Sequence, residues 1–284
     1  MTHIVDTLIE ERASRLMRHP LVWRLIMRTL HRALGYEEAV AMADTIASMS
    51  GAEVFEYMSD LLALDVTVDG LDEVPDRGSV VVMPNHPTGV ADGVVVYDAL
   101  KRVREDIVFF ANRDALRVSP GMEDMIVPVE WVEEKRTLTR QRETLRAAAA
   151  AFRRQRLIVL FPSGRLARPS VQGLMERPWQ TTAISLAKKH NAPVVPMHIR
   201  GHNSWLFYLF WLLHDELRDI TLFRELLNKK EAAYEVRIGE MFEPEGDVKT
   251  LTADLRRFVT EKMPRGARTW RGMEQQSSAS LSSG

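Results

Sequence analysis

The chain has 284 residues, a formal net charge of −1 and a 45% share of hydrophobic residues, a composition that predicts a globular protein with one large core or two modest ones. This charge balance does not favour nucleic acid as a partner. Because the chain contains no cysteine, disulfides, zinc–thiolate sites and a thiol nucleophile are excluded, which fits a reducing compartment.

The N-terminal quarter of the chain is dominated by helical patterns. Residues 1–18 indicate a polar helix, and a second helix is expected over residues 21–34. Two more helices are expected over residues 36–64, with a break at Ser50. We therefore expect residues 1–64 to form an N-terminal helical layer, which is also a candidate membrane-interface segment.

The helix expected over residues 21–34 has two chemically different sides. One side carries leucine, isoleucine and tryptophan, and the other carries an arginine at every fourth position, namely Arg24, Arg28 and Arg32. Such a helix suits an anionic membrane interface, but a surface helix docked on its own core shows the same pattern. The first residues lack the order of a signal peptide, and no apolar run reaches the roughly 20 residues of a spanning helix. We expect a cytoplasmic protein that is soluble or peripheral on the inner face of the cytoplasmic membrane.

From residue 65 onward, short apolar runs alternate with helical patterns. Strands are expected over residues 65–70, 79–83, 107–112, 125–129, 157–161, 192–199 and 234–239. The main helices between and after them are expected over residues 94–103, 137–155, 177–190 and 248–262. Because alternating strands and helices form crossover connections, the pattern predicts an α/β fold with a central, mostly parallel sheet flanked by helices. We place this domain at residues 65–264, before a disordered tail at residues 265–284.

One uncharged run remains ambiguous. Residues 205–213 read Trp-Leu-Phe-Tyr-Leu-Phe-Trp-Leu-Leu, which is too short to span a bilayer. The run suits the headgroup level of a membrane or the wall of an acyl groove. A buried core helix is an equal alternative, because periodicity does not separate these cases.

The most informative stretch joins the second expected strand to the following helix. It reads Asn-His-Pro-Thr-Gly-Val-Ala-Asp-Gly over residues 85–93, at a strand end, where α/β sheets bind their ligands. A neutral imidazole accepts a proton near neutral pH, and a neighbouring carboxylate fixes its tautomer and stabilises the imidazolium. We therefore predict that His86 is a general base and that Asp92 orients it. The alternative is an N-cap aspartate beside an unrelated turn histidine.

A second loop with functional chemistry follows another strand. Residues 161–165 read Phe-Pro-Ser-Gly-Arg; a guanidinium suits a phosphate, and glycine lets the backbone approach a ligand closely. The candidate substrate-binding residues are therefore Ser163, Gly164 and Arg165, although such turns are common and their arginines are often only solvated. Arg113, after a different strand, is a further candidate, and a surface arginine is an equal alternative for it.

Both loops resemble motifs of the glycerolipid (lysophospholipid) acyltransferase family. Asn-His-Pro-x-Gly-x-x-Asp-Gly is similar to its first motif, and the Val-Pro strand at residues 192–199 is similar to its fourth. The family commonly has four residues between histidine and aspartate, whereas this chain has five, at residues 87–91. That departure, with residues 201–209 and 224–230, resembles a subgroup of hemolysin-like and lyso-ornithine-lipid O-acyltransferase proteins.

The resemblance covers roughly residues 66–245 and implies a function. It implies that a fatty acyl group moves from acyl-CoA or acyl carrier protein to the hydroxyl of a lysolipid, of the phospholipid or ornithine-lipid type. No metal and no cofactor beyond the thioester co-substrate are expected. The first motif adds Asn85 to the substrate-binding candidates. Family members often carry Phe-Pro-Glu-Gly-Thr-Arg where this chain has Ser163 in place of the acid, which argues against a plain glycerol-3-phosphate acceptor.

Acyl transfer from a thioester to a hydroxyl needs a base and donors for the developing oxyanion. His86 would take the hydroxyl proton and later protonate the leaving thiolate, while backbone N–H groups near Gly164 are candidate oxyanion donors. No acyl-enzyme is required, in accord with the absence of cysteine and of a Gly-x-Ser-x-Gly elbow.

Two alternative functions stay open. One is a non-catalytic peripheral lipid-binding protein with the same fold. The other is a metal-dependent hydrolase that uses His86, Asp92, His198 and His202. Gly201 and the preceding Val-Pro strand argue against the helix that an i, i+4 histidine pair would need.

Overall fold

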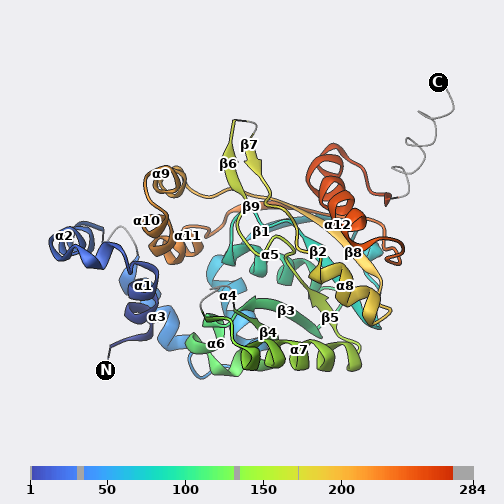
Figure 1. The fold of residues 1–284 in the computed structure, drawn as a ribbon, viewed down its shortest axis with the longest axis horizontal. Helices are drawn as coiled ribbons and strands as arrows, with labels where there is room; N and C mark the ends of the chain where they lie inside the picture. The colour runs from blue at the N-terminus through green and yellow to red at the C-terminus, as the bar shows by residue number, and fades with distance from the viewer. Residues whose placement is uncertain (1, 31–34, 131–134, 172, 271–284) are drawn as a thin grey trace.

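The computed structural model describes residues 2–30, 35–130, 135–171 and 173–270 (Figure 1). In these ranges seven strands form one sheet, in the order β1-β9-β8-β2-β5-β3-β4. The strands are β1 (Asp65–Asp69), β2 (Val80–Pro84), β3 (Ile107–Asn112), β4 (Ile126–Val129), β5 (Leu157–Val159), β8 (Val194–Arg200) and β9 (Ala233–Ile238). Neighbouring strands run parallel except β8 and β9, which are antiparallel. The predicted α/β fold with a mostly parallel sheet is confirmed.

Helices cover both faces of the sheet. Side chains from α4 (Gly51–Leu62) and α5 (Val90–Leu100) pack on one face. Side chains from α7 (Leu138–Arg153), α8 (Thr182–Lys189) and α12 (Val248–Arg257) pack on the other. Every residue of β2 is buried, because a strand inside a doubly covered parallel sheet has both faces in the core. This burial explains the continuous apolar run before His86.

The N-terminal helices form a smaller, separate core. It joins α1 (Ile4–Arg12), α2 (Pro20–Leu30) and α3 (Tyr36–Ile46) to α10 (Asp215–Ile220). The single polar helix expected over residues 1–18 is wrong: α1 ends at Arg12, and its buried side chains are Val5, Leu8 and Ile9. Residues 31–34, including Arg32, lie outside the described residues.

The predicted break at Ser50 is confirmed as a helix start. The Ser50 hydroxyl accepts the N–H of Glu53, and the Glu53 carboxylate accepts the N–H of Ser50 at 2.8 Å. This capping box satisfies two backbone donors that α4 leaves unpaired at its N-terminus. The helix boundary therefore follows from local chemistry alone.

Several elements were not predicted. They are α6 (Asp114–Val118), the hairpin of β6 (Arg168–Ser170) and β7 (Gly173–Met175), α10, and α11 (Leu222–Leu227). The hairpin projects at the top of the view in Figure 1, with α9 (Trp205–Leu213) and α10 to its left.

The tail boundary expected at residue 264 also differs from the structure. The Trp270 ring stacks on Phe242 with 5.2 Å between centroids and meets Phe258 edge-on. The chain up to Trp270 therefore packs on the core, and residues 271–284 lie outside the described residues. No helix within the described ranges is both long and apolar enough to cross a bilayer.

Candidate active site

The structure brings the two residues of the first motif together. The Nδ1 atom of His86 lies 2.8 Å from Oδ2 of Asp92. Asp92 is not the N-cap that the sequence suggested, because α5 begins at Val90 and Asp92 is its third residue. Gly89, the residue before α5, has a φ of +91°, a conformation that favours glycine. The sharp turn there points the carboxylate of the first helical turn back toward the histidine.

Asp92 is fully buried and held by several donors. Its Oδ2 atom accepts the backbone N–H groups of Thr88 and Gly89, both at 2.9 Å. Its Oδ1 atom accepts the Thr88 hydroxyl, which also lies 3.1 Å from the hydroxyl of Tyr234. A buried carboxylate is tolerated when it is hydrogen-bonded in this way. Thr88, which sequence reasoning missed, therefore holds the aspartate that contacts His86, and Tyr234, also missed, contacts Thr88.

The His86 ring is packed but partly open to solvent. Its side chain is 20% exposed, and one face lies on the Phe161 ring, with 4.4 Å between centroids. Since Asp92 occupies Nδ1, the tautomer that this contact favours carries its proton on Nδ1. No hydrogen-bond partner of Nε2 occurs in the part of the chain that the structure describes, so the contact with Asp92 engages Nδ1 and leaves Nε2 without a partner there.

The backbone of His86 forms hydrogen bonds with Ala167 and Glu176, the residues that flank the β6–β7 hairpin. Its carbonyl accepts the N–H of Ala167 at 2.9 Å, and its N–H donates to Oε2 of Glu176 at 3.2 Å. Glu176 is buried and also contacts Ser163 and Nε1 of Trp179. Burial raises the pKa of Glu176, although its hydrogen bonds oppose the rise. The carboxyl group of Glu176 thus contacts Ser163, but no sequence pattern identified Glu176 as a site residue.

The second predicted loop lies next to this segment, and part of its polar chemistry is already engaged. The Ser163 hydroxyl donates to the carbonyl of Arg165 at 2.8 Å. The N–H of Gly164 donates to the carbonyl of Phe161 at 3.0 Å, and Gly164 has a φ of +59°. Gly164 therefore shapes the turn, and its own N–H is not available as an oxyanion donor. The Arg165 side chain is exposed.

The two other candidates have structural partners. Asn85 donates to the carbonyl of Ile199 at 2.9 Å and accepts the N–H of Ile199 at 2.7 Å, so its amide joins the end of β2 to β8. Arg113 donates to Glu143 on α7 at 2.6 Å. No direct contact between Arg113 and His86 occurs among the described residues. Asn85 thus holds the loop of the first motif, while Arg113 ties α7 to the end of β3.

The residues of the metal-hydrolase alternative do not form a common site. His198 lies on a strand, β8, and burial lowers its pKa to about 4. Within the described ranges, no group of three or more histidine, aspartate or glutamate side chains could hold a metal ion.

The uncharged run of α9 is divided between core and solvent. Phe207 and Phe210 are buried, while Trp205, Leu212 and Leu213 are 75%, 79% and 63% exposed.

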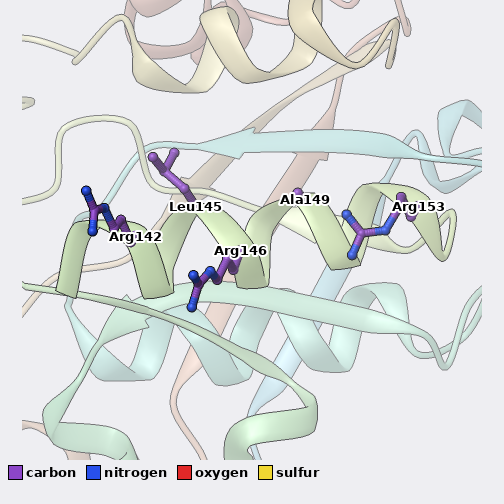
Figure 2. A pocket seen from close by; sticks show the side chains of 5 residues that line it. All are labelled: Arg142, Leu145, Arg146, Ala149 and Arg153. Carbon is purple, nitrogen blue, oxygen red and sulfur yellow. The ribbon is translucent and has the colours of Figure 1, made fainter. Parts of the chain in front are cut away.

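On the other side of the molecule, an open depression on α7 is lined by Arg142, Leu145, Arg146, Ala149 and Arg153 (Figure 2). None of the predicted site residues lines this depression.

Comparison with known proteins gives four further findings. A sequence model of the family described as Acyltransferase matches residues 65–200. A lyso-glycine lipid O-acyltransferase from Phocaeicola vulgatus is 22% identical over 204 residues, which cover 72% of this chain and 71% of the relative. The protein of the same name from Bacteroides thetaiotaomicron is 23% identical over 204 residues, 72% of each chain. The crystal structure of the 1-acyl-sn-glycerophosphate acyltransferase from Thermotoga maritima covers 73% of this chain and 79% of its own, with 17% identity and a TM-score of 0.46.

Proposed function

We propose that this chain is a glycerolipid acyltransferase, a family whose sequence model matches its residues 65–200, and that it transfers a fatty acyl group from a thioester donor to the hydroxyl of a lysolipid. The observation that carries the proposal is the contact between His86 and Asp92, 2.8 Å long, at the carboxyl end of β2. The donor is acyl-CoA or acyl carrier protein. Since both relatives are named for lyso-glycine lipid, an amino-acid lysolipid is the first acceptor to test, ahead of a lysophospholipid.

The geometry supports a direct transfer. Nε2 of His86 takes the proton of the acceptor hydroxyl while the hydroxyl oxygen attacks the thioester carbonyl. The tetrahedral intermediate then releases the thiolate, and His86 transfers the proton of the acceptor hydroxyl to this thiolate. Asp92 keeps Nδ1 protonated and stabilises the imidazolium between these two steps. Because the N–H of Gly164 is engaged, other backbone N–H groups of the same loop would stabilise the oxyanion.

The proposal is tested by acyl transfer from labelled acyl-CoA and acyl carrier protein to a panel of lysolipids. The panel contains lyso-glycine lipid, lyso-ornithine lipid, lysophosphatidic acid and lysophosphatidylglycerol. We expect His86→Ala to lower kcat by about a hundredfold or more, the usual contribution of a general base. The matched control is His202→Ala, which removes an exposed imidazole.

Each outcome of this assay discriminates between the functions. Near-wild-type turnover of His86→Ala would refute the base assignment. Loss of turnover in His202→Ala as well would show that the effect is not specific to His86. If the folded wild type transfers no acyl group with any pair, the non-catalytic lipid-binding alternative replaces the proposal.

We also propose that the N-terminal segment, residues 1–64, contacts an anionic membrane through α2. Leu21 and Leu25 are 78% and 62% exposed, and Arg24 and Arg28 are exposed beside them. Exposed leucines next to arginines suit the interface of an anionic bilayer. In Figure 1, α2 and α9 lie on the same side of the molecule, so the exposed residues of α9 are a second candidate contact.

Vesicle flotation tests the membrane contact. The double variant Leu21→Ser/Leu25→Ser should bind vesicles of phosphatidylglycerol and phosphatidylcholine about tenfold or more weakly, because it removes two apolar side chains from the contact. The control is Leu138→Ser/Leu145→Ser on α7, where the two leucines are 72% and 56% exposed. Equal losses in both variants would contradict a specific role for α2.

A further inference from the structure

Four arginines gather beside the loop of His86. Arg165 lies in the turn after β5, Arg168 is the first residue of β6, Arg177 follows β7, and Arg218 lies in α10. Burial and the charges of the other three arginines together lower the pKa of Arg177. Because like charges repel one another, bringing these arginines together has an electrostatic cost.

Two of these arginines directly follow, in the sequence, residues that hydrogen-bond to the backbone of His86. The residues that grip the backbone of His86 are Ala167, at 2.9 Å, and Glu176, at 3.2 Å. The following residue in each case is an arginine, Arg168 or Arg177. Ala167 holds His86 through its own backbone N–H, so Arg168 starts about 3.8 Å from that residue, Cα to Cα; Glu176 reaches His86 through its side chain, and Arg177 is the next residue along the chain.

The aromatic ring of Trp211, on α9, completes the cluster. The guanidinium carbon of Arg218 lies 4.4 Å from the ring centroid, and that of Arg177 lies 5.7 Å from it. Guanidinium groups at these distances interact favourably with an indole face. Trp211 therefore links Arg177, which follows the hairpin, to Arg218 of α10.

The cluster has more positive charge than its neighbours neutralise. Arg218 pairs with Asp215 at 2.9 Å and with Asp219 at 2.7 Å. Over the described ranges, no ion pair is found for Arg165, Arg168 or Arg177. Moreover, Nε of Arg177 is buried and lacks a hydrogen-bond partner there. A buried donor of a charged group is costly to leave unpaired, and a bound anion would satisfy it.

We infer that Arg168 and Arg177 form an anion-binding site beside His86, which extends the candidate site at Arg165. The ligand is a phosphate or a carboxylate group, because guanidinium groups bind both with paired hydrogen bonds. The inference rests on the proposed function for the source of that anion. The source is either the headgroup of the lysolipid or a phosphate of the thioester donor.

Direct binding of inorganic phosphate tests the site without any acyl transfer. Wild type and Arg177→Gln are titrated with phosphate by calorimetry, with Arg146→Gln, on the exposed face of α7 (Figure 2), as the matched control. We expect Arg177→Gln to weaken phosphate binding about tenfold, as for the loss of a hydrogen bond to a charged group, and Arg146→Gln to leave it unchanged. Arg168→Gln, at an exposed position, repeats the test if Arg177→Gln fails to fold.

Kinetics then identify the source of the anion. A rise in KM for the lysolipid alone assigns the site to the headgroup, and a rise in KM for acyl-CoA alone assigns it to the donor; in both cases kcat should change less than KM. The inference is overturned if wild type binds no phosphate, or if Arg177→Gln and Arg168→Gln bind it as tightly as wild type. Phosphate binding that depends on Arg177 in a protein without acyl transfer would instead keep the site and reject the proposed function.

Discussion

The hydroxyl of Thr88 offers a sharp test of how the site is held. It donates to Oδ1 of the fully buried Asp92 and also contacts Tyr234 at 3.1 Å. Thr88→Val keeps the shape of the side chain and the backbone N–H that reaches Oδ2, but it removes the hydroxyl donor from Oδ1. The buried carboxylate then loses a charge-assisted hydrogen bond.

The expected loss of stability follows from that contact. A hydrogen bond to a charged group contributes about 1.5–3 kcal/mol, so Thr88→Val should lower the free energy of unfolding by about that amount. For a chain of this size, each kcal/mol corresponds to about 2–4 °C in Tm, which gives a fall of roughly 3–12 °C. We also expect kcat to fall about tenfold or more, because a carboxylate that is less firmly held orients His86 less well.

The chain offers a matched control for the same chemical change. Thr252 and Thr88 are both 3% exposed, but the Thr252 hydroxyl donates to the neutral carbonyl of Val248 within its own helix, at 2.7 Å. Thr252→Val should cost about 1 kcal/mol or less and leave kcat unchanged. Urea unfolding and steady-state acyl transfer are measured for both variants.

Two results would refute the reasoning about Thr88. If both variants lose the same free energy of unfolding, the carboxylate does not depend on the Thr88 hydroxyl. If Thr88→Val loses stability but keeps its kcat, the hydrogen bond supports the fold and does not serve catalysis through the orientation of His86.

Two further changes test the surroundings of the site. A Cβ atom at Gly201 would collide with the ring of Tyr234, so Gly201→Ala should lower the free energy of unfolding by about 1–3 kcal/mol; Gly93→Ala, which meets nothing within 4 Å, is the control, and equal urea midpoints would contradict the clash. Burial raises the pKa of Glu176 above its ordinary value of 4.5, so the folded state binds this proton more tightly than the unfolded state. The stability of wild type relative to Glu176→Gln should therefore fall as the pH rises from 4.5 through the raised pKa. Urea unfolding at several pH values checks this, and a stability difference that does not vary with pH would show that Glu176 is not perturbed.

Much of the architecture could be predicted because its causes are local. The capping box of Ser50 and Glu53 starts a helix from two side chains three positions apart. A continuous apolar run predicts the buried strand before His86, since both faces of that strand lie in the core. The His86–Asp92 pair spans six positions and one turn, so its proximity needs little tertiary information. By contrast, the alternative of an N-cap position for Asp92 does not hold, because the helix begins earlier, after the turn at Gly89.

The groups that surround the pair lie far away in the sequence. Tyr234 is 146 positions from Thr88, and Glu176 is 90 positions from His86. Local periodicity has no access to such distances, because it reports which side of an element is buried but not which element lies next to it. Local periodicity likewise does not predict that Arg177 and Arg218 both contact the ring of Trp211.

The amino-acid sequence by itself therefore determined the α/β class, most helix and strand positions and the loop that carries His86 and Asp92. The tertiary structure alone decided what completes that loop. Because β9 runs antiparallel to β8, it is the start of β9, and not its end, that lies at the edge of the sheet where β2 ends. This reversed strand brings Tyr234 to Thr88, and strand direction within a sheet depends on pairing between distant segments, which no local pattern encodes.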